Sequence, residues 1–149
     1  MANLSDTSCL IMKTYLVAKG LFTLPSLEGT WPLYETSLPD GINVEDNAAS
    51  VNDSQDVINS RDMSSGENFK HYGIMILIRA LDYEIGWLKA KSVLTDLCAV
   101  HNVPVSVGAN SYTLGAVTKN SGILNLGTES GTKRRYKFEL SFNVTLEEV

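Results

Sequence analysis

One segment near the end of the sequence alternates apolar and polar residues without a break, and it constrains the fold more than any other feature. Its apolar members are Tyr136, Phe138, Leu140, Phe142, Val144 and Leu146. Successive side chains of a strand point to opposite faces of a sheet, whereas a helix repeats every 3.6 residues. The alternation therefore predicts a half-buried strand, long enough to reach past its own subunit or to form a long hairpin.

Other segments predict further strands around this one. Five consecutive apolar residues within 72–79 predict a strand that is covered on both faces at the centre of the sheet. Pro104 limits the strand expected at 103–107 to an edge or a strand start, because proline has no N–H for the ladder. A turn then leads into a strand over 111–118, and residues 31–38 predict a short extended piece.

Two segments predict helices. Residues 5–19 contain no proline or glycine, begin at candidate caps Ser5 or Asp6, and stop at Gly20, where a left-handed cap is expected. A second helix is predicted from its cap, Asp82, to about residue 100.

The second helix has an apolar face at helical spacing. This face consists of Tyr83, Trp87, Ala90, Leu94, Leu97 and Cys98. Gly86 in its first turns costs about 1 kcal/mol relative to alanine. Together the patterns predict an α+β class: a mainly antiparallel sheet with a long amphipathic helix packed on it and an N-terminal helix, in a single domain over residues 1–149.

Negative charge is concentrated in one part of the chain. The formal net charge is -5, but residues 35–67 hold eight acids against one base. A long acidic loop is predicted over about residues 40–68, with one weak strand at 48–51. This acidic balance argues against a grip on nucleic acid, which depends on Lys and Arg contacts to phosphate. The start of the sequence lacks the pattern of a signal peptide, and no apolar run approaches the roughly 20 residues that cross a bilayer, so synthesis in a cytoplasm without a membrane partner is expected.

The sequence offers no convincing constellation for catalysis or metal binding. Cys9 and Cys98 each lie within an apolar helical pattern and are predicted to be buried thiols. Cys98 and His101 are spaced like two metal ligands, but a structural zinc needs about four. Residues 127–133 look superficially like a phosphate loop, although a hairpin turn explains them better. We therefore expect no enzyme activity, no metal and no cofactor.

One basic cluster stands out. Lys133, Arg134, Arg135 and Lys137 lie at the start of the long alternating strand, and Arg79 ends the apolar strand. Charge asymmetry within one chain favours contact between identical subunits, so Arg79, Arg134, Arg135 and Lys137 are predicted to meet the acidic loop of a neighbouring copy.

The order of these pieces resembles a known family. The relevant features are the run 69–83 followed by Gly86 and Lys89-Ala90 in a helix, the strand with Tyr112, the loop ending near Gly127-Thr128, and Arg134-Arg135-Tyr136 opening a last strand with Asn143. This pattern resembles the tail-terminator family of long-tailed bacteriophages, sometimes labelled minor capsid proteins. The resemblance covers roughly the last eighty residues and contains no catalytic motif.

The resemblance implies a structural virion protein at the head–tail interface. Six copies of such a protein form a ring that stops tail-tube polymerisation and joins the tail to the head connector or neck protein. DNA would pass through the channel without specific binding. We expect Glu45, Asp46, Asp53 and Asp56 to face that channel, because an acidic lumen repels phosphates.

Two other interpretations remain open. A head-completion or neck protein would occupy the same virion region but would bind the portal adaptor in place of the tail tube. A monomeric ligand-binding α+β domain would show a pocket and a single-copy mass in solution.

Overall fold

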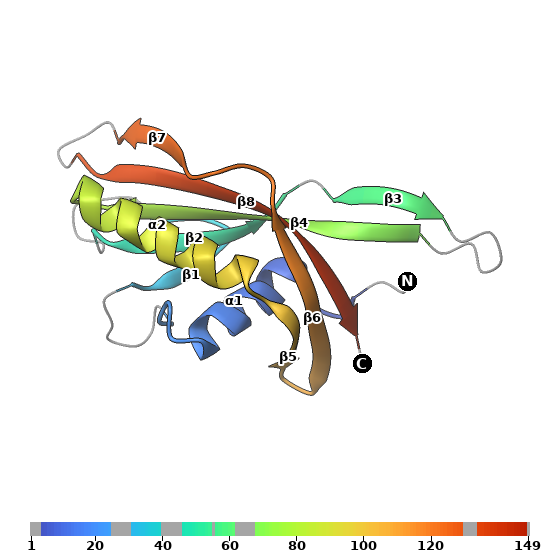
Figure 1. Cartoon of the computed structure of the whole chain (residues 1–149). Coiled ribbons are helices and arrows are strands. Elements are labelled where there is room, and N and C mark those ends of the chain that lie inside the picture. The colour runs from blue at the N-terminus through green and yellow to red at the C-terminus, as the bar shows by residue number, and fades with distance from the viewer. Residues whose placement is uncertain are drawn as a thin grey trace.

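A computed structural model describes residues 4–24, 31–39, 46–54, 56–61, 68–129 and 134–148 of the 149-residue chain. The described part is an α+β structure with two helices and a curled mixed sheet (Figure 1). The elements in chain order are α1 (Ser8–Ala18), β1 (Leu33–Glu35), β2 (Ala48–Asp53), β3 (Val57–Arg61), β4 (Asn68–Ala80), α2 (Tyr83–Cys98), β5 (His101–Val107), β6 (Asn110–Lys119), β7 (Leu124–Thr128) and β8 (Tyr136–Glu148). The predicted α+β class is confirmed.

The sheet is built around its two longest strands. Its order is β1-β2-β4-β8-β6-β5, with β3 added to β4 and β7 added to β8. Only the β1–β2 pair is parallel among the described strands, so the sheet is mainly antiparallel as predicted. β8 pairs with β4 along one side and with β7 and then β6 along the other. β8 therefore pairs within its own chain along its length, as a central strand with three neighbours.

The alternation in β8 places its apolar side chains in the core. Phe138, Leu140, Phe142, Val144 and Leu146 are all buried. Phe138, Leu140 and Phe142 lie opposite three buried isoleucines of β4, at positions 78, 76 and 74. Side chains of both helices belong to the same core cluster, and the sheet curls so that β2 and β5 both contact α1. On the other face of β4, Met75 and Leu77 are only half-buried, so coverage on both faces was predicted wrongly for this stretch.

Local signals define the helix ends. Thr7, and not Ser5 or Asp6, is the N-cap of α1, because its hydroxyl accepts from the Leu10 N–H at 3.3 Å. Gly20 follows the helix with φ of 82°, which confirms the predicted left-handed stop.

The capping prediction for α2 is confirmed, but its buried face differs from the predicted one. The Asp82 carboxylate accepts from the Glu84 N–H at 2.9 Å. The buried residues are Gly86, Ala90, Val93 and Leu97, whereas Tyr83, Trp87 and Cys98 of the predicted face are exposed. The glycine explains the difference, because it allows the helix to approach the sheet closely on the side that the apolar pattern did not mark. The expected amphipathic pattern is therefore not what the helix shows.

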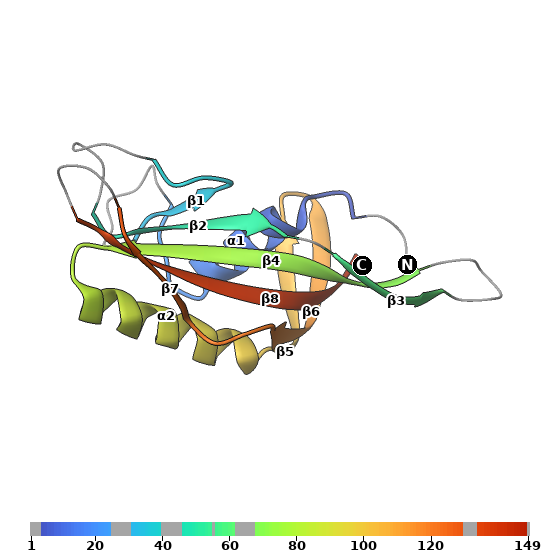
Figure 2. The same ribbon diagram turned by 90° about the horizontal axis from the view of Figure 1, so that it is seen from above.

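The weak strand predicted at 48–51 within the acidic stretch 40–68 is confirmed as part of β2, whereas the strand β3 in the same stretch was not predicted. β2 pairs with β4 over six residues and β3 pairs with the start of β4. Ala48, Ala49 and Val51 are fully buried, so small apolar residues in an Asn- and Asp-rich stretch were sufficient to form a strand inside the sheet. β3 and the start of β4 form a two-stranded ribbon that projects from the rest of the molecule (Figures 1 and 2).

Candidate functional site

Two arginines are buried at one end of the sheet. Arg79 is the penultimate residue of β4 and Arg135 immediately precedes β8, and they are 0% and 1% exposed. Arg79 lies directly opposite Lys137 on the face of the sheet that points away from the core isoleucines. Arg79, Arg135 and Lys137 therefore lie close together. Arginine and lysine are almost never fully buried unless they are paired.

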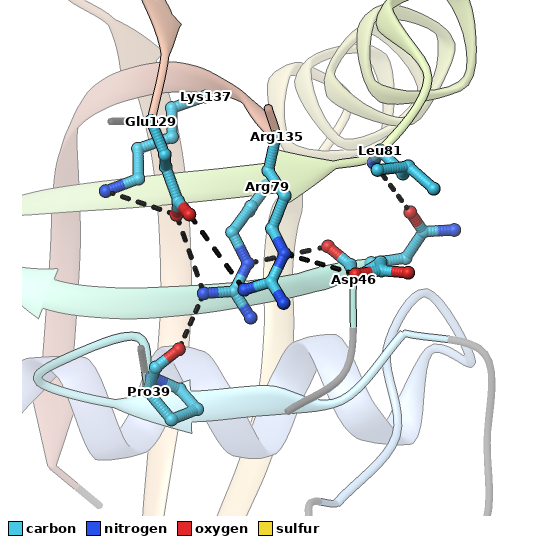
Figure 3. Close-up of polar contacts among 8 residues, drawn as sticks. Pro39, Asp46, Arg79, Leu81, Glu129, Arg135 and Lys137 are labelled. Carbon is cyan, nitrogen blue, oxygen red and sulfur yellow. Dashed lines mark hydrogen bonds and ion pairs between the residues drawn. The ribbon is translucent and has the colours of Figure 1, made fainter. Parts of the chain in front are cut away.

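Glu129, which follows β7, lies among these three cations. Its Oε1 is 3.6 Å from Arg79 Nη1 and 3.5 Å from Lys137 Nζ, and its Oε2 is 3.9 Å from Arg135 Nη1 (Figure 3). The backbone N–H of Glu129 also donates to the Arg135 carbonyl at 2.8 Å. These distances describe ion pairs close to the outer limit of contact, and the single negative charge of Glu129 offsets part of the positive charge of the three cations.

A second segment closes the cluster from the other side. Arg135 Nε donates to Asp46 Oδ1 at 3.1 Å, and Arg79 Nη1 donates to the Pro39 carbonyl at 2.6 Å (Figure 3). Arg79 Nε reaches the Asp46 carbonyl at 3.4 Å. The cluster therefore fastens Pro39, which follows β1, and Asp46, which precedes β2, together with the chain after β7, to the end of β4 and the start of β8.

Ion pairs and hydrogen bonds of charged side chains hold these segments together. Removing arginine from water is costly, and the cost is offset only where ion pairs and hydrogen bonds replace the lost hydration. We refer to Asp46, Arg79, Glu129, Arg135 and Lys137 as the arginine cluster.

The arginine cluster changes the interpretation of the predicted subunit interface. Arg79 and Arg135 were expected to meet acids of a neighbouring copy, but acids of the same chain surround them. Arg134 is exposed and the Lys137 side chain is one-third exposed, so these two remain accessible to another molecule. Glu129 was missed because residues 127–133 were interpreted only as a turn, and no pattern in the sequence marks its partners.

The predicted channel-facing acids do not share one surface. Glu45 lies outside the described residues, and Asp46 belongs to the arginine cluster. Asp53 lies opposite Ile74 at the far end of β2. Six strand residues span roughly 17–20 Å, so Asp46 and Asp53 lie at opposite ends of β2.

Asp53 and Asp56 both hold backbone groups in place. Asp53 Oδ1 accepts from Ser8 Oγ at 2.5 Å and from the Cys9 N–H at 3.0 Å, at the start of α1. A carboxylate there is favoured by the partial positive charge of a helix N-terminus. Asp56 accepts from the Gly73 N–H at 3.0 Å. Both aspartates are nevertheless exposed residues.

A further polar cluster joins the chain before α1 to β6. Tyr112 donates to Asp6 Oδ2 at 2.5 Å, and Asn110 donates to the same oxygen at 3.0 Å. These bonds lower the pKa of Asp6. Burial and the bond to Asp6 raise the pKa of Tyr112 to about 12.

The two thiols differ in exposure. Cys9 is buried, and burial raises its pKa, whereas Cys98 is exposed, which corrects the prediction of two buried thiols. Among the residues that the structure describes, no group of three or more His, Cys, Asp and Glu could hold a metal ion. Within the same residues, no helix is long and apolar enough to cross a membrane.

Comparisons with known proteins provide no family: no protein-family model matches the chain, and no curated protein matches it.

Proposed function

We propose that this chain is a structural subunit of a long-tailed bacteriophage, at the interface between head and tail. Six copies would form a ring that ends tail-tube polymerisation and joins the tail to the head connector. The order of sequence motifs noted above suggests this role, and the distribution of charge over the described surface supports it.

The observation that carries the proposal is the separation of accessible charges along the long strand pair. Arg134 and Lys137 lie where β8 begins, next to the end of β4. Asp53 and Asp56 lie at the other end, beside Ile74 and Gly73 of β4. Opposite charges at two ends of one chain cannot meet within that chain, but they meet when identical copies associate head to tail. Repetition of such a contact closes a ring when the rotation between copies is right.

The ribbon of β3 and β4 provides a second support. β4 pairs with β8 only from Tyr72 onward, so residues 68–71 have β3 as their described neighbour. A two-stranded ribbon is marginally stable in water on its own. A neighbouring subunit or a tail-tube protein would supply the additional contacts that such a projection needs.

Native mass spectrometry of the purified protein, alone and with tail-tube protein of the same phage, tests the proposal. We expect a hexamer in at least one sample, and Arg134→Glu should weaken it. Lys119→Glu, the same charge change at an exposed site on β6, is the matched control and should leave the hexamer intact.

Other outcomes discriminate the alternatives. Binding to the portal adaptor without binding to the tube protein would favour the head-completion or neck role. A single-copy mass in every mixture would contradict the ring and favour a monomeric ligand-binding domain.

The proposed channel is separate from the proposed subunit contact. In a ring that does not pair Asp53 and Asp56 with Arg134 and Lys137, these exposed members of the expected acidic lining would face the channel and repel DNA phosphates. A reconstruction of the ring on the tail that shows a neutral or basic channel wall would contradict this part of the proposal.

A further inference from the structure

The outer face of α2 exposes large apolar side chains, which is unusual for a protein surface. Ile85 and Leu88 are 48% and 53% exposed, and they form a stripe on one side of α2 because they are three residues apart in the helix. Leu81, just before the N-cap Asp82, is 50% exposed. The opposite face of the helix is already buried against the sheet. A helix that is apolar on both sides normally has a second surface covering it. Figure 2 shows α2 as an outer layer of the fold, with no described element on its outer side.

The spacing of this stripe continues along the helix. Ser92 and Thr95 extend the steps of four and three residues, and both are exposed. This is the a and d pattern of helices that pack side by side. Leu88, Ser92 and Thr95 also line a shallow hollow together with Leu21, Lys91 and Asp96.

The charged residues beside the stripe are complementary to the same residues on an identical, antiparallel helix. Glu84 and Lys91 are both exposed, seven residues apart, and they flank the same edge of the stripe. In an antiparallel pair of identical helices centred between Ile85 and Leu88, Glu84 of each copy lies within about two residues, roughly 3 Å along the axis, of the other copy's Lys91. Lys89 takes no part, because its ammonium group donates to the Leu21 carbonyl.

We propose that the outer face of α2 binds the same face of α2 in a second copy of this chain, antiparallel and around a two-fold axis. Ile85 of one copy packs against Leu88 of the other. Two Glu84–Lys91 ion pairs flank the contact. A second copy is the occupant because an antiparallel copy of α2 carries the same acid and base in reverse order, so each charge on one helix edge lies near its opposite on the other.

The proposal does not rest on the ring. A two-fold contact joins copies in pairs and cannot by itself generate a cyclic assembly. It describes how free subunits associate before or apart from assembly on a tail. Because the face is small, the dimer should form in the micromolar range or weaker.

Sedimentation velocity of wild type, Glu84→Lys and Lys91→Glu, each over a concentration series into the hundreds of micromolar, tests the contact. Wild type should dimerise as concentration rises. Each variant alone should remain monomeric, because like charges then face each other. An equimolar mixture of the two variants should dimerise again, because the two bases on the helix edge of one variant then face the two acids on the helix edge of the other.

Matched controls are Glu147→Lys and Lys119→Glu, which make the same charge changes at exposed sites away from α2 and should dimerise like wild type. Circular dichroism and thermal unfolding of each variant verify the fold. A monomeric wild type at all concentrations, dimers in both single variants, or failure of the mixture to dimerise would each overturn the proposal. A hexamer formed with tube protein by Glu84→Lys would show that the ring and the two-fold contact are separate.

Discussion

Gly86 of α2 lies so close to Phe138 of β8 that a Cβ at this position would come within 2.7 Å of the phenyl ring. The Ala80 methyl group would lie 2.9 Å away on another side. The absence of a Cβ at Gly86 therefore allows α2 to pack closely on the sheet at this position. Its cost to helix formation is offset by this close approach, which buries the neighbouring residues of the helix.

Gly86→Ala should destabilise the protein although alanine is the better helix former. Overpacking costs about 1–3 kcal/mol, and two contacts under 3.0 Å place this site in the upper part of that range. Since the helix gains about 1 kcal/mol, a net loss of roughly 1–2 kcal/mol is expected in urea unfolding. Gly122→Ala is the control, since nothing lies within 4 Å of its added Cβ. Equal stability of Gly86→Ala and wild type would contradict this packing role.

Glu129→Gln should destabilise the arginine cluster. The carboxylate offsets Arg79, Arg135 and Lys137, and removing one partner from a buried ionic group costs about 3 kcal/mol. Urea unfolding of the variant should show this loss. Glu139→Gln makes the same change on the same face of β8 as Lys137 and should change stability by less than about 0.5 kcal/mol. Similar losses in both variants would mean that the cluster is no more than a set of surface charges.

Alkaline unfolding should depend on Tyr112. Its pKa is raised from 10.0 to about 12 by burial and by the bond to Asp6, so the folded state holds the proton more tightly than the unfolded state. The contribution of Tyr112 to the free energy of unfolding is fully present below about pH 10 and is lost as pH rises from about 10 towards about 12. Tyr112→Phe should show a smaller stability loss over this window, measured by chemical unfolding at a series of pH values. Replacement of the exposed Tyr83 by Phe should leave the wild-type slope, and an unchanged slope in Tyr112→Phe would refute the assignment.

In the native protein, one of the two cysteine thiols should react quickly with a thiol reagent. Cys98 is exposed, whereas Cys9 is buried and its pKa is raised by that burial. A thiol-reactive chromophore should therefore label one site quickly, and labelling of Cys9 should require unfolding. Cys98→Ser should abolish the fast phase. Two fast sites in wild type would show that α1 opens readily.

The elements with strong local signals were predictable from the sequence. The uninterrupted alternation of β8 is compatible only with a strand, Asp82 satisfies an N–H at the start of α2, and Gly20 adopts a conformation that other residues avoid. Each of these signals acts over a few residues, so no knowledge of the tertiary fold was needed.

Features that depend on distant neighbours were not predictable. β2 was predicted only as a weak strand at 48–51, because its polar surroundings obscured the three small residues that pairing with β4 buries, and β3 was not predicted. The buried face of α2 is set by Gly86 against the sheet and not by the largest apolar side chains. The arginine cluster combines Asp46, Arg79 and Glu129 across long separations in the sequence, and a charge pattern alone could not distinguish pairing within the chain from pairing between copies.

The place of β8 in the sheet has a consequence for biosynthesis. β1, β2 and β4 on one side and β6 and β5 on the other are joined within the sheet only through this strand, which follows all the other described strands in the chain. Earlier segments can form hairpins and helices, but the two halves cannot close around a common core until residues 136–148 have emerged from the ribosome. Contacts between segments so distant in the chain form slowly. A nascent chain that stalls before this segment would expose the inner faces of both halves to solvent, and the chain can complete its fold only after synthesis has passed this strand.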